Sequence, residues 1–209
     1  MLRYADGIVG DVIDELDRLG LRENTFVFVA SDNGTEKSLT ARSNGREVQG
    51  DLYSLSEAGG NVALLANCPR RIPGGRTIAL ADFTDIYPTV CELAGVPLSS
   101  AHRPDGQSFA RFLLGTQGAR PPRTWILNEY HVTRVVRDER FKLYSDGRLF
   151  DSNSDPVEQH DLSASDDAAV AAARERLQAV LDGLSADAPP PFPLRSLSAF
   201  KIRGEQLRR

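Results

Sequence analysis

The 209-residue sequence predicts an α/β fold, in which helices flank a mainly parallel sheet, followed by a small antiparallel sheet and a last helix. Three observations predict it. An amphipathic helix pattern precedes a continuous apolar run of strand length, which is typical of a strand buried on both faces of a parallel sheet. A second apolar run and a second helix follow. Further along, short segments rich in aromatic and β-branched residues alternate with turn-forming pairs, as antiparallel strands do.

The first elements make up half of an α/β crossover unit. Residues 1–19 place apolar side chains at i, i+3, i+4 and i+7 spacing, and Gly20 ends the predicted helix. The run TFVFVAS, residues 25–31, then predicts a buried strand. A polar, glycine-rich stretch from Gly34 to Gly60 separates it from NVALLANCP, residues 61–69, which predicts a second buried strand.

The next helix is predicted over residues 85–94, because capping residue types precede it and Gly95 and a proline follow it. Between residues 124 and 150, the runs TWILNEY, VTRVVRD, RFKLYSD and RLFD predict about four antiparallel strands. An alanine-rich helix follows, capped by Ser165 or Asp166 and ending near Gly183.

These elements predict a division into three parts. Residues 1–120 form the α/β part, residues 121–186 the small antiparallel sheet with its helix, and residues 187–209 a proline-rich, extended tail.

Composition excludes several classes of function. The formal net charge of -4 offers no basic surface, so no nucleic-acid partner is expected. No apolar run approaches the roughly 18 residues of a membrane-spanning helix, so no membrane span is expected. The two cysteines, Cys68 and Cys91, do not make a disulfide framework or a metal pair. They are either two small buried thiols or one disulfide.

The Asp32-Asn33 pair at the end of the first buried strand is the candidate site. In an open parallel sheet, the ligand crevice lies beyond the carboxyl ends of the strands. Carboxylate and carboxamide oxygens are hard ligands that suit Ca²⁺ or Mg²⁺. The alternative is a tight Asp-Asn-Gly turn in which both side chains bond only to backbone.

A family resemblance extends these interpretations. The following segments occur in the order in which the C-terminal half of arylsulfatase-type sulfatases has them: YADGIVGDVIDELDRLGLRENTFVFVASDNGT, EAGGNVALLANCPRRIPGGRT, DFTDIYPTVCELAGVPL, DGQSF, RDERFKLY and LFDSNSDPVEQHDL. Over residues 4–162 the chain therefore resembles this part of the sulfatase family. The resemblance implies a partial alkaline-phosphatase-like sheet and, as the parent reaction, hydrolysis of sulfate esters. It also implies a Ca²⁺ ion, held in part by Asp32 and Asn33, that binds the sulfate ester oxygens.

The sequence departs from the family pattern at three places. Sulfatases make a formylglycine nucleophile from a Cys/Ser-x-Pro-x-Arg motif, and neither Cys68 nor Cys91 lies in one. The remaining acidic metal ligands of the family come from an early strand that lies upstream of all these segments. A Gly-Lys-Gly lysine that contacts sulfate in the family is also missing, because the corresponding residues are Asp51, Leu52 and Tyr53. Lys37 is either a substitute for it or an exposed loop lysine.

These departures predict that the chain is an incomplete or inactive form that needs an N-terminal half to act on a sulfate ester. One alternative is a non-catalytic remnant that binds anions, sugars or a protein, and another is a phosphate or phosphonate ester hydrolase of the same superfamily. Without such a half, an uncovered sheet edge predicts self-association. Glu57 either turns the chain before the second strand or faces substrate, and His131 either packs at a strand edge or faces the cleft.

Overall fold

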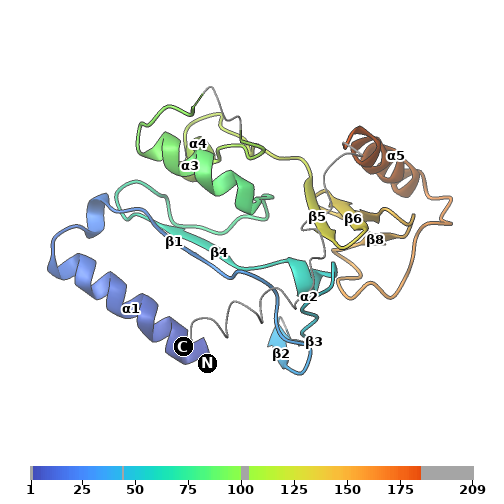
Figure 1. The fold of residues 1–209 in the computed structure, drawn as a ribbon, viewed down its shortest axis with the longest axis horizontal. Helices are drawn as coiled ribbons and strands as arrows, with labels where there is room; N and C mark the ends of the chain where they lie inside the picture. The colour runs from blue at the N-terminus through green and yellow to red at the C-terminus, as the bar shows by residue number, and fades with distance from the viewer. Residues whose placement is uncertain (1, 44, 100–103, 185–209) are drawn as a thin grey trace, which may run out of the picture. The chain divides into compact units, whose positions relative to one another are not determined.

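The computed structural model describes residues 2–43, 45–99 and 104–184, which form two compact units (Figure 1). The first unit comprises the described residues of Met1–Ile126 together with Arg137–Arg140, and the second comprises Leu127–Val136 and the described residues from Phe141 onward. The predicted tail at residues 187–209 lies outside the described residues. No helix among residues 2–43, 45–99 and 104–184 is long and apolar enough to cross a bilayer.

The first unit carries four helices and four strands among its described residues, joined by two 3-10 turns. They are α1 (Leu2–Arg18), a 3-10 turn (Arg22–Asn24), β1 (Val27–Ala30), β2 (Thr40–Ser43), β3 (Arg46–Gln49), α2 (Glu57–Gly60), β4 (Leu64–Asn67), a 3-10 turn (Phe83–Asp85), α3 (Ile86–Leu93) and α4 (Ala110–Leu113). The long helix α1 and the helix α3 confirm the two helical predictions for this part of the chain.

The pairing of β1 with β4 corrects the prediction of a parallel sheet at this point. The two strands are antiparallel, with Val27 opposite Asn67 and Ala30 opposite Leu64. Burial on both faces was also wrong for β4, because the Leu65 side chain is 62% exposed. A short apolar run indicates a buried strand, but it does not indicate whether the neighbouring strand runs parallel or antiparallel to it. The predicted sheet with flanking helices is therefore represented here by two strands.

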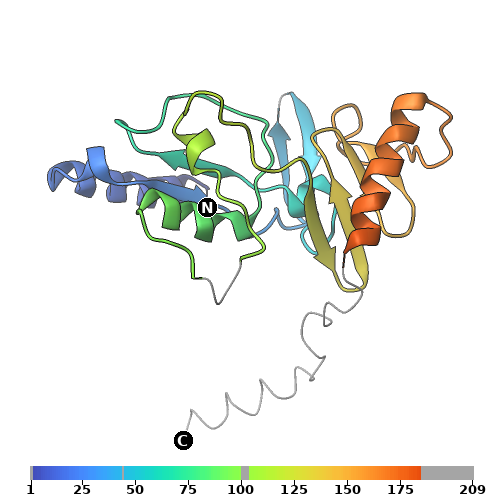
Figure 2. The ribbon, with the colours of Figure 1, turned by 90° about the horizontal axis from the view of Figure 1, so that it is seen from above.

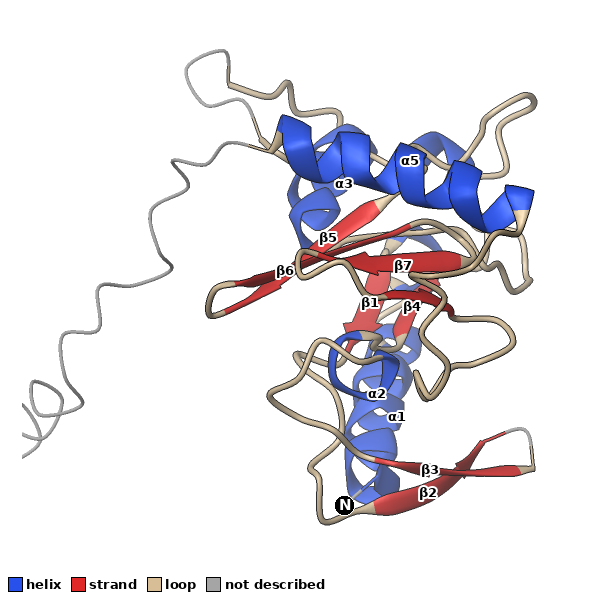
Figure 3. Ribbon diagram, turned by 90° about the vertical axis from the view of Figure 1, so that its right-hand side faces the viewer, coloured by secondary structure: helices blue, strands red, loops and turns tan. Residues whose placement is uncertain are grey.

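The segment between β1 and β4 contains a hairpin that was not predicted from its polar, glycine-rich sequence. Strand β2 pairs with β3 in antiparallel register, from Thr40 opposite Gln49 to Ser43 opposite Arg46. Figure 3 shows this hairpin as a two-stranded element separate from β1 and β4.

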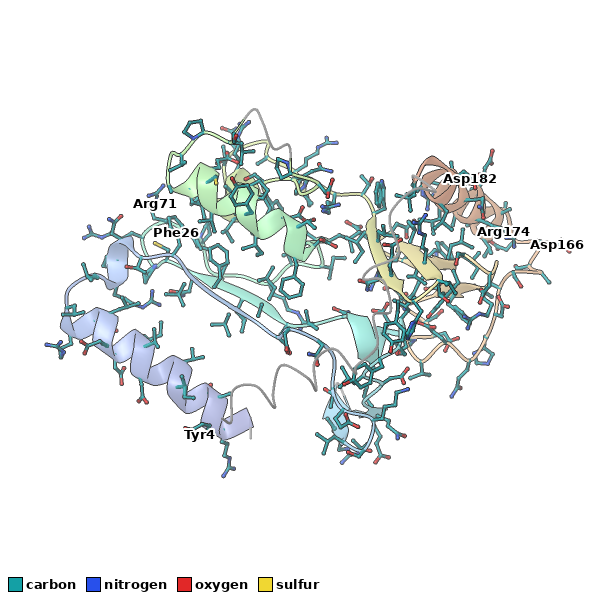
Figure 4. All side chains as sticks on the ribbon, viewed as in Figure 1. Tyr4, Phe26, Arg71, Asp166, Arg174 and Asp182 are labelled. Carbon is teal, nitrogen blue, oxygen red and sulfur yellow. The ribbon has the colours of Figure 1, made fainter. Side chains whose placement is uncertain are left out.

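Apolar side chains remain exposed along α1. Val9, Ile13 and Leu16 are half-buried, whereas Tyr4, Ile8 and Val12 are exposed. Tyr4 is labelled at the start of the helix in Figure 4. Residues next to β1 are better covered: the Arg71 guanidinium lies 5.2 Å from the centre of the Phe26 ring, a cation-π contact (Figure 4).

A buried ion pair anchors α3 within the first unit. Asp85 is fully buried, the Arg123 side chain is 7% exposed, and Arg123 Nε lies 2.6 Å from Asp85 Oδ2. Asp82 and Asp85 form a reciprocal capping box at the 3-10 turn before α3. The Thr89 hydroxyl donates to the Asp85 carbonyl at 2.7 Å and accepts from the Phe109 amide at 3.1 Å. These bonds join α3 to the segment that leads into α4.

The second unit is a four-stranded sheet with one helix, as the sequence predicted, although the end residues Ile126 and Arg137 of its strands are grouped with the first unit. The strands are β5 (Ile126–Tyr130), β6 (Thr133–Arg137), β7 (Phe141–Tyr144) and β8 (Leu149–Asp151), in the order β5-β6-β7-β8. The helix α5 (Ala168–Gly183) contacts β7 and lies along the sheet (Figure 2). Its cap is Asp167, which accepts from the amides of Ala169 and Val170, and not Ser165 or Asp166. Three consecutive capping types made the choice of residue ambiguous.

Strand β7 is buried along its whole length and carries a lysine. The Lys142 side chain is 2% exposed, and its ammonium lies 2.6 Å from Glu158 Oε1. The Tyr144 hydroxyl donates to Glu158 Oε2 at 2.5 Å. Glu158 has a φ of 57°, in the left-handed region that non-glycine residues rarely adopt. A specific local conformation therefore places this carboxylate against the sheet.

Candidate functional site

The Asp32-Asn33 turn follows β1 directly, and its backbone bonds hold it in place. The Ser31 amide donates to the Ala63 carbonyl at 3.2 Å, and the Gly34 amide donates to the Gly59 carbonyl at 3.1 Å. The Ser31 hydroxyl donates to the carbonyl of Asn33 at 2.8 Å. The turn is therefore fixed on both sides without using the carboxylate or the carboxamide.

The side chains of Asp32 and Asn33 are exposed. In the part of the chain that the structure describes, neither side chain makes a hydrogen bond or an ion pair. The described residues therefore contradict the alternative in which both side chains bond only to the backbone of the turn. Both groups are available to a ligand.

Gly34 and Gly50 let two loops, residues 31–39 and 50–60, pack backbone against backbone, and Gly59 allows equally close packing within the second loop. A Cβ on Gly34 would lie 2.1 Å from the Ala58 carbonyl oxygen, and one on Gly59 would lie 2.4 Å from that of Ser54. A Cβ on Gly50 would lie 2.2 Å from the carbonyl oxygen of Glu36. No side chain larger than hydrogen fits at these positions. We call these two segments the loop pair.

Asp51 organises the second of these loops. Its Oδ2 accepts from the hydroxyls of Ser54 at 2.5 Å and Ser56 at 2.7 Å, and its Oδ1 lies 3.2 Å from the Lys37 ammonium. The Ser54 hydroxyl, followed by that of Ser56 and by Lys37, holds the pKa of the Asp51 carboxyl below its ordinary value, against the opposing effect of partial burial. Asp51 is thus a stable anion at neutral pH.

Glu57, the first residue of α2, is engaged within the first unit. Its Oε2 accepts from Arg137 Nη1 at 2.6 Å and from Asn61 Nδ2 at 3.1 Å. The side chains of Glu57 and Arg137 are each 15% exposed. These contacts favour a structural role for Glu57, since its carboxylate already has two partners.

The histidines and cysteines have local surroundings that do not bring them to the Asp32-Asn33 turn. The His131 ring packs edge-on to Tyr130 at 4.3 Å between β5 and β6, and His160 lies 3.5 Å from Asp155 Oδ2. His102 lies outside the described residues. Cys68 is buried and Cys91 half-buried, and both thiols are free, so the disulfide alternative is wrong.

The donor set at the turn fits part of a cation site. Asp32 and Asn33 offer hard oxygens with no competing partner among the described residues, which matches the chemistry of Ca²⁺. Across the part of the chain that the structure describes, no three His, Cys, Asp or Glu side chains cluster in a way that could hold a metal ion. The turn can therefore supply two ligand residues to a site that needs more.

The sequence indicated this turn, but it did not indicate the side-chain contacts of the loop of residues 50–60. The partners of Asp51 and Glu57 come from residues 14 and 80 positions away, Lys37 and Arg137. The spacing of Gly34, Gly50 and Gly59 was the one local signal of close backbone approach.

Comparison with known proteins places these features in a family context. A family model described as Sulfatase matches residues 1–96. Arylsulfatase K of Bos taurus is 28% identical over 224 residues, covering 99% of this chain and 38% of the relative. Arylsulfatase K of Homo sapiens is 32% identical, with 76% and 31% covered, and Arylsulfatase G of Mus musculus is 31% identical, with 76% and 34% covered. The chain thus spans about a third of the length of the curated relatives it matches.

Solved structures match over most of the chain. A 2-O GAG sulfatase superposes with a TM-score of 0.63 at 25% identity, covering 83% of this chain and 39% of that one. The protein Ps i-CgsB superposes with a TM-score of 0.70 at 23% identity, covering 100% and 47%. A structure bound to its substrate D-glucosamine-2-N,6-O-disulfate gives 0.67 at 23% identity, covering 85% and 37%. The shared fold is the alkaline-phosphatase-like α/β fold.

Proposed function

Because this chain belongs to the sulfatase family and has its α/β fold, we propose that it contributes the metal-binding side of a site that hydrolyses sulfate esters. The observation that carries the proposal is the Asp32-Asn33 turn. It follows β1, its backbone is held on both sides, and its two side chains are exposed and unpaired among the described residues. A preformed turn of this kind binds a ligand without first breaking internal bonds.

Ca²⁺ is the ion that we propose for this turn. The carboxylate of Asp32 and the carboxamide oxygen of Asn33 would hold it. When bound, a hard dication stabilises the negative charge that develops on the ester oxygens and on the leaving alcohol. Ca²⁺ takes six to eight oxygen ligands, so these two residues fill at most about half of its positions. The remaining ligands must come from groups other than this pair.

The names of the relatives support a proposal for the substrate class. The curated relatives are named arylsulfatases, and the structural neighbours include a GAG sulfatase and a protein bound to a sulfated glucosamine. We infer that the ester is an aryl or sugar sulfate. The 209 residues contain no Cys/Ser-x-Pro-x-Arg motif, so the nucleophile is not one of their cysteines.

Calcium titration of the chain tests the metal turn. Because Asp32 and Asn33 are the two available ligand residues, we expect a dissociation constant on the order of 10⁻⁴ to 10⁻³ M, as in sparsely liganded sites. Calorimetry should show that Asp32→Ala abolishes this binding. Glu36→Ala is the matched control, since it removes an equal charge from the same loop and should bind like the unaltered chain.

Two results would contradict the metal turn. Unchanged calcium binding in Asp32→Ala would refute it. Equal losses in Asp32→Ala and Glu36→Ala would show that only general charge attracts the ion. Micromolar affinity that depends on Asp32 would show that further oxygens converge on the turn, with Asp51 and Glu57 the first to test.

Turnover by the 209 residues alone is expected to be absent. Without the formylglycine precursor, the chain should not hydrolyse a generic aryl sulfate above the background rate. A chromogenic aryl sulfate assay with added Ca²⁺ measures this, and Cys68→Ala serves as a control for an unexpected thiol nucleophile. Hydrolysis that persists in Cys68→Ala and is lost in Asp32→Ala would contradict the expectation and indicate another nucleophile in this chain.

A further inference from the structure

A small pocket of the first unit lies between α3 and the segment that runs through α4. Its volume is about 240 Å³. Glu92 reaches it from α3, Arg111 and Phe112 from α4, and Arg120 from the segment after α4. None of the residues that line it belongs to the loop pair, and Figure 1 shows α3 and α4 apart from α2. The pocket is therefore built from other elements than the metal turn.

Backbone hydrogen bonds bring the two arginines to the same pocket. The Thr116 amide donates to the Arg111 carbonyl at 3.0 Å, and the Ala119 amide donates to the Thr116 carbonyl at 2.9 Å. Gly118 has a φ of 75°, in the left-handed region, which lets the chain reverse its direction there. The position of Arg120 relative to Arg111 is thus set by the fold of this turn.

The start of α4 is anchored in the first unit by buried groups. Phe109 is 7% exposed, and its ring packs edge-on to the Phe28 ring of β1, with 6.5 Å between the ring centres. The Phe109 amide donates to the Thr89 hydroxyl of α3 at 3.1 Å. The helices that supply the pocket are therefore joined to each other and to β1.

The charged side chains of the pocket have no partner among the described residues. The guanidiniums of Arg111 and Arg120 make no hydrogen bond or ion pair there, and neither does the Glu92 carboxylate. Opposite charges thus line one pocket without neutralising each other. The Ser108 hydroxyl, also in the lining, accepts from the Ala110 amide at 3.2 Å and keeps its O-H for another acceptor.

These groups match a sugar ring that carries one oxyanion group. Guanidinium forks bind the oxygens of sulfate or carboxylate with paired, charge-assisted hydrogen bonds. A carboxylate such as that of Glu92 repels a bare anion, but it accepts hydrogen bonds from the hydroxyls of a sugar. The half-buried Phe112 adds an aromatic surface against which the apolar side of a sugar ring can pack.

Charge and size limit the ligand further. Two arginines and one glutamate give the pocket one net positive charge, which balances the single negative charge of a sulfate monoester or a sugar carboxylate. The volume of about 240 Å³ is below the roughly 300–1,000 Å³ of sites for drug-sized ligands, so the pocket is expected to take a single sugar ring.

We propose that this pocket binds one sugar residue, whose sulfate or carboxylate group is held by Arg111 and Arg120 and whose hydroxyls donate to Glu92. The inference goes beyond the proposed function, because it uses no residue of the Asp32-Asn33 turn and requires no metal ion. Together with the proposed function, it favours a polymeric substrate, held at two of its sugar units, over a small aryl sulfate.

The test is titration of the 209-residue chain with glucose 6-sulfate, glucuronate and glucose, without Ca²⁺ and at constant ionic strength, followed by NMR. At least one of the two anionic sugars should bind, with a dissociation constant on the order of 10⁻³ M, as small ligands with few contacts do. Glucose should not bind. The tighter of the two anionic sugars identifies the oxyanion that the pocket prefers.

Two variants assign the binding to the pocket. Arg111→Gln and Arg120→Gln are each expected to raise the dissociation constant of the tighter sugar about tenfold or more, because hydrogen bonds to a charged group are lost. Both side chains are exposed, so both variants should keep the urea midpoint of the unaltered chain. Arg76→Gln, which removes an exposed cation of the same unit outside the pocket, is the matched control and should leave the affinity unchanged.

Glu92→Gln distinguishes a sugar from a bare anion. It should lower the preference for the anionic sugar over inorganic sulfate severalfold, because the carboxylate that accepts the sugar hydroxyls is lost. A pocket for bare anions would gain affinity for both ligands by the same factor, since only a repelling charge is removed, and this result would overturn the sugar assignment.

The remaining outcomes separate this inference from the proposed function. It is overturned if neither anionic sugar binds, if both arginine variants bind like the unaltered chain, or if Arg76→Gln weakens binding as much as they do. Asp32→Ala should leave the sugar affinity unchanged. Sugar binding by a chain that does not bind Ca²⁺ would refute the metal turn alone, and Ca²⁺ binding that depends on Asp32 without any sugar binding would refute this inference alone.

Discussion

Asp85→Ala is expected to destabilise the first unit by about 3–5 kcal/mol, because it leaves a buried guanidinium without its counter-charge. Both oxygens of Asp85 are used: Arg123 donates to Oδ2 through Nε and to Oδ1 through Nη2, each at 2.6 Å. The amides of Asp82 and Gln107 add bonds at 2.9 and 2.7 Å. Removal of the carboxylate therefore breaks the ion pair and leaves two backbone donors without this acceptor.

Urea unfolding measures this loss, with Asp82→Ala as the matched control. Asp82 is also an acidic cap residue at the same turn, but its side chain accepts from Thr84 and, in the capping box, from the Asp85 amide, so its loss should cost about 1 kcal/mol. The double replacement Asp85→Leu with Arg123→Leu should recover part of the stability, since no charge is then left buried. A loss below about 1 kcal/mol in Asp85→Ala would contradict the assignment of this pair as the anchor of α3.

Gly34→Ala is expected to be the second most damaging change, with a cost of about 3 kcal/mol and a loss of calcium binding. The new methyl group would lie 2.1 Å from the Ala58 carbonyl oxygen and 2.6 Å from that of Gly59. Both are backbone atoms, so the loops must separate to accommodate it. Because the Gly34 amide is one of the bonds that hold the turn, separation should also displace Asp32 and Asn33.

Gly10→Ala is the control for this change. Gly10 lies inside α1 with open space around its Cα, so alanine there should stabilise the chain by about 0.5–1 kcal/mol through helix propensity. Unfolding curves and calcium titrations of both variants make the comparison. Native stability in Gly34→Ala would mean that the two loops do not pack as a pair.

The elements that the sequence predicted correctly are those whose signal is local. The 3.6-residue periodicity of residues 1–19 and the caps around α3 report on a helix by themselves. The direction of β1 relative to β4 could not be derived in this way, because it depends on a partner more than 30 residues away. The β2-β3 hairpin was missed because its strands have no apolar face, although the dipeptide Asn44-Gly45 is a strong hairpin signal.

The candidate site, like the fold, could be predicted from the sequence only in part. The place of Asp32 and Asn33 at the end of a strand could be predicted, because a strand-length apolar run stops immediately before them. The pairing of Lys37 with Asp51 and of Glu57 with Arg137 could not, since no spacing rule links residues 14 or 80 positions apart. The calcium ion and the sulfate ester remain proposals to be tested by the titrations above.

The buried lysine of β7 has a consequence for how the second unit selects its strand alignment. Alternation of apolar and polar residues normally specifies strand register, but every residue of β7 is buried, so a shifted strand would still bury apolar side chains. A shift of β7 against β8 would carry the Lys142 ammonium away from Glu158. Two opposite charges in a largely buried environment would then be separated. We infer that this ion pair favours the observed strand alignment over shifted ones and so contributes to the uniqueness of the folded state.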